Sequence, residues 1–189
     1  PVFFHNLKGY DSHFIIKEMN KVKKTYINKN GEEVECKHQV TVVAANSEKY
    51  ITFSFKKLQF LDSLAFLNNG LDKLVNKLLQ SKGKDGLKHT RQHIKNDEKF
   101  NLATRKWVYP YEYIDCIERL QETQLPPIEC FYSALTETGI SPEDYEHARK
   151  VWKAGNMKTL GDYHDFYLLT DVLLLADVFE DFRKTCQSH

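Results

Sequence analysis

The 189-residue sequence has few cysteines, almost no net charge and no long apolar run. Its four cysteines form no Cys-x-x-Cys pair and are separated by long, uneven gaps, which argues against a disulfide framework or a zinc knuckle. We therefore expect a reducing, intracellular compartment, without a choice between nucleus, cytoplasm and organelle. No apolar run reaches the roughly 18 residues that a membrane span needs, so no membrane partner is expected.

Positive and negative charges are almost equal in number in this sequence. Lys and Arg number 27 against 26 Asp and Glu. This balance excludes a protein that coats nucleic acid with a uniformly basic surface, but it allows a basic patch. The eight glycines form no phosphate-binding loop, and no internal repeat or low-complexity tract is visible.

The beginning of the sequence carries neither a signal peptide nor an initiator Met. It opens on Pro1-Val-Phe-Phe-His-Asn6, an apolar run typical of a buried strand. We therefore expect the chain to be a fragment of a longer protein. Its length suits one domain or part of a larger one.

The apolar pattern predicts a mixed α/β chain, with strands early and helices late. The predicted strands are short apolar runs at 2–5, 40–43, 50–55 and 58–61. Asn46-Ser47 is the expected turn of an antiparallel hairpin. The predicted helices have apolar residues at helical spacing, over 11–24, 71–80, 142–154 and 160–185. Ser141 and Thr159 are expected N-caps, and Asp162 completes a capping box with Thr159.

The segment 77–106 is basic, with nine Lys or Arg against three Asp or Glu. It contains Gly83 and Gly86 and few large apolar residues, which predicts a loop or an irregular insertion over 81–106. Such a segment is either a solvated linker or a contact for nucleic acid.

The last predicted helix carries Asp171 and Asp177 among apolar residues. Tyr163, Tyr167 and Asp171 are spaced four residues apart and so lie near one face. An aspartate in a largely buried helix is costly unless it binds a partner or a metal. The alternative is that both aspartates lie on a solvated stripe.

Asn6 and Asp11 follow the first predicted strand, where loops often carry functional residues. A carboxylate there is well placed for a site. The alternative role for Asp11 is a helix N-cap, which is common for Asp at such a position.

Together these residues resemble family B DNA polymerases, in particular the protein-primed branch. His5–Asp11 resembles their second exonuclease motif, and Tyr167–Asp171 matches the third, Tyr-x-x-x-Asp. Asp62-Ser-Leu64 resembles the Ser-Leu motif that contacts single-stranded DNA. Arg105-Lys106, followed by Tyr109–Tyr113, resembles the lysine-bearing segment of that branch.

The stretch 158–183 also resembles polymerases of virus-like DNA transposons (the Polinton or Maverick type) and their organellar-plasmid and viral relatives. The matches span nearly the whole chain in the family's order. The resemblance implies a DNA polymerase that replicates a virus-like or mobile element. Residues 1–189 would be part of its 3′→5′ exonuclease domain. The implied fold is ribonuclease-H-like, a mixed sheet flanked by helices that lacks its first strands, with the 160–185 helix packed against the sheet.

The resemblance also implies a two-metal hydrolysis that removes a mispaired 3′ nucleotide. Asp11 and Asp171 would bind Mg²⁺ or Mn²⁺, which prefer oxygen ligands. Tyr167 would orient the attacking water, and Lys106 would contact the scissile phosphate and offset its charge.

The implied partners are a single-stranded 3′ end or primer–template DNA and a terminal priming protein. Asn6, Ser63 and Leu64 would hold the frayed DNA end. Phe14 would either stack on a base or pack in the core.

The sequence departs from the family pattern in two places. Trp107 stands where relatives often carry Gly after the lysine. The first motif, Asp-x-Glu, is absent, because only five residues precede Asn6. Glu33-Val-Glu35 lies on the wrong side of the second motif and resembles an acidic cluster at a turn. We therefore predict that the isolated chain is a poor or inactive nuclease, with an exposed sheet edge prone to association.

Two competing hypotheses keep the fold without catalysis. The chain could be a remnant that binds single-stranded DNA, with 77–106 dominating its affinity, or a scaffold for protein contacts. His89-x-x-x-His93 lacks the Glu and the third ligand of a zinc site, and Cys36-x-His38 is isolated, so neither pair predicts a metal centre.

Overall fold

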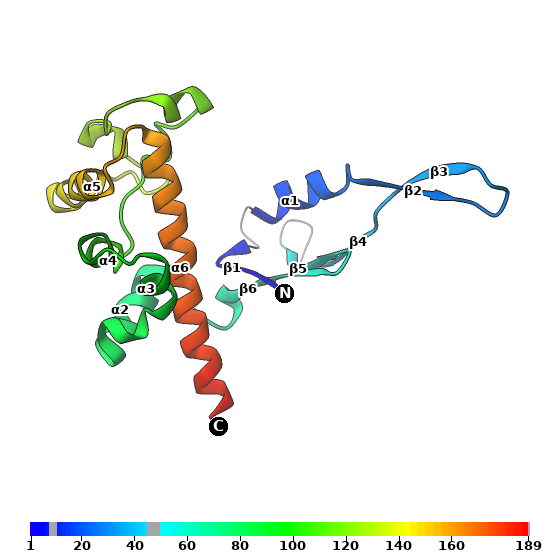
Figure 1. Cartoon of the computed structure of the whole chain (residues 1–189), viewed down its shortest axis with the longest axis horizontal. Coiled ribbons are helices and arrows are strands. Elements are labelled where there is room, and N and C mark those ends of the chain that lie inside the picture. Colours follow the sequence, from blue (N-terminus) through cyan, green and yellow to red (C-terminus); the bar gives the residue numbers. More distant parts are fainter. Residues whose placement is uncertain (8–10, 45–49, 189) are drawn as a thin grey trace. The chain divides into compact units, whose positions relative to one another are not determined.

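The computed structural model describes residues 1–7, 11–44 and 50–188. These residues divide into two compact units, Pro1–Asn69 and Gly70–His189, and each unit is described by itself (Figure 1). The first unit holds the strands and the second is built from helices. The chain is therefore α/β, as the sequence predicts.

A four-stranded mixed sheet forms the centre of the first unit, in the order β1-β6-β5-β4. Its strands are β1 (Val2–Phe4), β4 (Val40–Ala44), β5 (Tyr50–Phe55) and β6 (Leu58–Asp62). β1 runs parallel to β6, and the other pairs are antiparallel. The predicted pairing of β4 with β5 is confirmed, whereas the predicted turn at Asn46-Ser47 lies outside the described residues. Association through an exposed edge stays a prediction.

Aromatic pairing between strands builds the core of this unit. Phe53 and Phe60 are opposite each other in the ladder, and their rings stack at a centroid distance of 4.6 Å. Leu7 and Phe55 complete the buried cluster. The helix α1 (Asp11–Met19) packs Ile15, Ile16 and Met19 against it. Met19 lies three residues after Ile16 and four after Ile15, so it is a neighbour of both on this side of the helix.

The predicted helix over 11–24 is too long. The chain turns after Met19, and β2 (Lys23–Ile27) pairs antiparallel with β3 (Glu33–Lys37) in a separate two-stranded ribbon. Gly31 has φ of +79° in the connecting turn, a conformation that glycine adopts without steric cost. The Asn28 side-chain oxygen accepts hydrogen bonds from the Asn30 and Glu32 amides. The acidic pair Glu33 and Glu35 therefore lies on a strand, not at a turn.

The second unit is organised around one long helix, α6 (Leu160–Gln187), against which α2 (Leu71–Lys82) and α3 (Lys88–His93) pack (Figure 1). α4 (Asp97–Ala103) contacts α5 (Pro142–Gly155). The predicted helices over 71–80, 142–154 and 160–185 are confirmed. So are their caps, because Ser141 accepts from the Asp144 amide and Thr159 forms a capping box with Asp162.

The loop predicted over 81–106 is corrected by the structure. This segment contains a 3₁₀ turn at Gly83–Gly86 and the helices α3 and α4. Further 3₁₀ turns lie at Ser63–Ala65, Ile117–Gln121 and Ile128–Phe131. Each of the two short helices buries only one or two side chains, so the segment shows little apolar periodicity.

The core of the second unit joins α5, α6 and the segment after α4. Buried Trp107, Val151, Leu160, Tyr163 and Tyr167 meet in one cluster. No helix in the described part of the chain combines the length and the apolar character of a membrane span. The predicted packing of the last helix against the sheet stays a prediction.

Candidate functional site

Three residues to which the family resemblance gives catalytic roles lie together in the second unit. Tyr167 and Asp171 are one turn apart on α6. Lys106 belongs to the extended segment that follows α4, and its Nζ lies 3.7 Å from Asp171 Oδ2. Two motifs that are far apart in the sequence therefore meet at one place on α6.

Aromatic packing holds this extended segment against α6. The Trp107 ring is 4% exposed and meets the rings of Tyr163 and Tyr167 edge-on, at centroid distances of 5.1 and 5.6 Å. Tyr109 stacks on Tyr167 at 4.8 Å. The Tyr163 hydroxyl donates a hydrogen bond of 2.7 Å to the Val108 carbonyl. Trp107, which departs from the family pattern, is thus a core residue that fixes the backbone beside Lys106.

The Tyr167 hydroxyl is part of a small polar network. It lies 2.8 Å from the Tyr111 hydroxyl, within hydrogen-bond distance. Burial, together with the charge of Asp171, raises the pKa of Tyr167 well above its usual value. Tyr167 therefore stays protonated at neutral pH and is suited to orient a water molecule. The sequence placed Tyr111 in the lysine-bearing segment but did not assign it a role.

Asp171 is the carboxylate of this cluster, and one of its oxygens is unsatisfied. Its Oδ1 atom is buried and has no hydrogen-bond partner among the described residues. Burial raises the pKa of Asp171, while the Lys106 charge and the Tyr167 hydroxyl act in the opposite direction. A buried carboxylate oxygen without a partner is rare in folded proteins, because it loses its hydration without compensation. Asp171 therefore keeps an acceptor oxygen that forms no hydrogen bond within the described part of the chain.

The donor chemistry of Asp171 fits a divalent cation, but one carboxylate is not a complete site. The described residues contain no group of three or more His, Cys, Asp or Glu side chains that could hold a metal ion. Mg²⁺ and Mn²⁺ are bound by oxygen ligands, which Asp171 supplies. A complete centre needs further carboxylates, of which Asp11 is the one that the sequence predicts.

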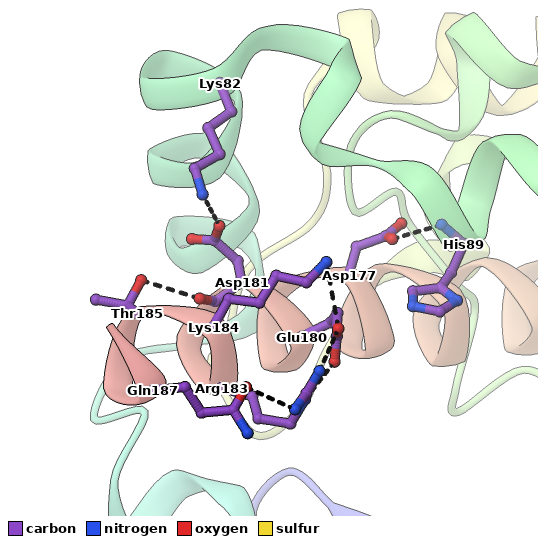
Figure 2. A network of polar contacts seen from close by, with 9 residues as sticks. All are labelled: Lys82, His89, Asp177, Glu180, Asp181, Arg183, Lys184, Thr185 and Gln187. Carbon is purple, nitrogen blue, oxygen red and sulfur yellow. Dashed lines mark hydrogen bonds and ion pairs between the residues drawn. The ribbon is translucent and has the colours of Figure 1, made fainter. Parts of the chain in front are cut away.

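Asp177, on the same helix, has a structural role instead. It is 2% exposed and accepts hydrogen bonds from the His89 amide (2.6 Å), the Thr90 amide (3.0 Å) and the Thr90 hydroxyl (2.7 Å). Figure 2 shows its carboxylate directed at the His89 backbone, beside ion pairs of Lys82 with Asp181 and of Arg183 with Glu180. The alternative of a solvated stripe is wrong for Asp177, because the side chain is buried and binds the start of α3.

In the first unit, the second motif and the Ser-Leu motif lie side by side at the ends of two parallel strands. Asp62 is buried, and its Oδ1 accepts from the Asn6 amide (2.9 Å) and the Leu64 amide (3.0 Å). Ser63 Oγ donates to the Phe4 carbonyl (2.8 Å) and lies 3.0 Å from His5 Nδ1. Asp62 therefore links the two loops.

The residues predicted to hold the DNA end differ in their accessibility. Asn6 is exposed and has φ of +71°, and Leu64 is half-buried. Ser63 is fully buried, so its hydroxyl fixes the loop instead of facing solvent. Phe14 is 53% exposed, which corrects the core-packing alternative and leaves base stacking as the prediction.

Asp11 lies in the first turn of α1 and is exposed. The positive end of the helix dipole favours a carboxylate there, as expected for a residue at a helix start. A side chain in this position is also accessible to a ligand, so both hypotheses for Asp11 stay open.

Comparisons of the chain with protein-family models, with curated proteins and with solved structures gave no match. The family resemblance therefore stays a prediction that rests on the motifs of the sequence.

Proposed function

We propose that the chain is part of the 3′→5′ proofreading exonuclease region of a family B DNA polymerase of the protein-primed type. The observation that carries the proposal is the meeting of Lys106, Tyr167 and Asp171, since these residues come from two separate motifs of that family. The mixed sheet and the helices make the chain α/β, which is the class of the ribonuclease-H-like fold that such a domain requires.

The proposed reaction is the hydrolysis of the last phosphodiester of a single-stranded 3′ end. Asp171 and Asp11 would hold Mg²⁺ or Mn²⁺, which when bound activates water and stabilises the leaving oxygen. The protonated Tyr167 hydroxyl would hydrogen-bond and orient the attacking water. Lys106 would place its ammonium group beside the scissile phosphate and offset its charge.

The first unit would bind the DNA strand. Asn6 and Leu64 lie on the two loops that Asp62 links, so both would contact the same stretch of an incoming strand. Ser63 would keep these loops in place, and the exposed ring of Phe14 would stack on a base. A terminal priming protein belongs to this proposal as a further partner.

A second candidate function is an inactive remnant that binds single-stranded DNA or another protein. The described residues contain no group of three or more His, Cys, Asp or Glu side chains that could hold a metal ion. The basic segment 77–106 presents exposed Lys84, Lys88 and Lys95, which suits contacts with phosphates.

The experiment is a digestion and binding assay with a 3′-labelled single-stranded oligonucleotide, with and without Mn²⁺. We expect binding of the 3′ end to be strengthened by Mn²⁺, with little digestion. Asp171→Ala should abolish the Mn²⁺ effect, whereas Asp165→Ala, an exposed carboxylate on the same helix, should leave it intact. If Mn²⁺ does not change the binding of the oligonucleotide by the wild type or by either variant, the exonuclease proposal is refuted and the remnant is favoured. Robust digestion abolished by Asp171→Ala would refute only the predicted inactivity.

A further inference from the structure

A groove of about 520 Å³ lies beside α5 in the second unit and belongs to none of the motifs above. Most of its wall is one face of α5, because Glu146, Arg149, Lys150 and Lys153 are spaced three or four residues apart along the helix. The lining residues are Leu125, Glu146, Arg149, Lys150, Trp152 and Lys153.

The groove is positively charged. It has three cationic side chains and one carboxylate, and Arg149 lies 3.4 Å from Glu146. Lys150 and Lys153 are exposed and have no ion-pair partner among the residues that the structure describes. Arg149 and Lys153 are one turn apart, about 6 Å along the axis. The cations therefore form a row along the helix instead of a single point of charge.

The groove also has an aromatic component, Trp152, which packs against the core of the unit. Trp152 is half-buried, and its ring packs against Tyr163 of the core at a centroid distance of 6.2 Å. The rest of the ring lines the groove together with Leu125. A Trp anchored in this way is presented to a ligand with little loss of conformational entropy on binding.

We propose that the α5 groove binds single-stranded nucleic acid. A row of cations follows a phosphate backbone, and an anchored aromatic ring offers a surface on which a base can stack. An acidic peptide would satisfy the cations but would leave the aromatic surface without a specific partner. This contact requires no metal ion, so it does not rest on the exonuclease proposal.

The test is the binding of an unstructured single-stranded oligonucleotide in EDTA over a range of salt concentrations. The double variant Lys150→Gln/Lys153→Gln removes two expected phosphate contacts from exposed positions. Each contact contributes about 0.7 to the salt slope of a single strand, so the slope should fall by about 1.4 and the affinity at 0.1 M salt by roughly 25-fold. Lys73→Gln/Lys158→Gln is the control, since both lysines are exposed in the same unit and lie outside the groove and outside the segment 77–106.

Tryptophan fluorescence reports on the second element of the groove. The sequence has two Trp, and Trp107 is buried, so quenching by the oligonucleotide should come from Trp152 and disappear in Trp152→Phe. Equal losses of affinity in the two lysine double variants would overturn the proposal, because only overall charge would then matter. Poly-glutamate is the competitor that tests for an acidic protein partner. If it displaces the bound oligonucleotide as well as unlabelled oligonucleotide does, and does not change the Trp152 fluorescence, the proposal is overturned in favour of such a partner. Asp165→Asn, which removes an exposed charge on α6 outside the groove, should bind as the wild type does in this assay, and the EDTA excludes any contribution of a bound metal ion.

Discussion

Two aspartates on the same helix have opposite environments. Asp177 is fully buried, and three hydrogen bonds from His89 and Thr90 saturate its carboxylate. Asp171 has a buried oxygen with no partner among the described residues, beside Lys106 and Tyr167. A carboxylate whose hydrogen bonds are complete stabilises the fold, whereas an incomplete one has capacity for a ligand. The difference separates the structural role of Asp177 from the ligand-binding role that we propose for Asp171.

The largest expected effect is on stability and comes from Asp177, which holds the start of α3. Asp177→Ala removes three hydrogen bonds and leaves two amides at the start of α3 without their acceptor. We expect a loss of about 3 kcal/mol in the free energy of unfolding, measured by urea denaturation. Asp165→Ala, at an exposed position of α6, should change it by less than about 0.5 kcal/mol. Equal effects of the two substitutions would show that Asp177 does not hold α3.

For Asp171 we predict a change in stability of the opposite sign to that of Asp177→Ala. The pKa of Asp171 is raised in the folded state by burial, so ionisation above that pKa costs stability. In metal-free buffer, Asp171→Asn should therefore stabilise the protein at neutral pH, by about 1 kcal/mol. The gain should vanish as the pH falls below the usual range of an Asp pKa, where both proteins carry a neutral side chain. Thermal midpoints over a pH series measure this, and a destabilised variant at neutral pH would contradict the account.

The smallest expected effect concerns Lys106. Its Nζ lies 3.7 Å from Asp171 Oδ2, and both side chains are partly exposed, so the pair contributes little to stability. Lys106→Gln should lower the free energy of unfolding by about 0.5 kcal/mol at neutral pH, since it removes a charge that favours the ionised Asp171. It should also move the pH dependence of stability to higher pH. A shift to lower pH would mean that Lys106 does not act on Asp171.

The sequence predicted most of the helices and the main hairpin, because their apolar residues follow a clear period. The ribbon of β2 and β3 was missed because most of its side chains are exposed, so no apolar alternation marks it. The partners of Asp177 were missed because His89 and Thr90 lie in a segment without helical periodicity. Asp171 and Tyr167 were found from their spacing, whereas the hydrogen bond of Tyr111 depends on tertiary packing.

The central claim is that Asp171 is available to bind a divalent cation. The most direct measurement is the thermal midpoint of the wild type and of Asp171→Asn during a Mn²⁺ titration at neutral pH. Asp165→Asn is the control for a nonspecific effect of ions on surface charge. We predict that Mn²⁺ stabilises the wild type and the control, because binding to the folded state raises stability, and has no effect on Asp171→Asn. Equal stabilisation of all three proteins, or of none, would contradict the claim.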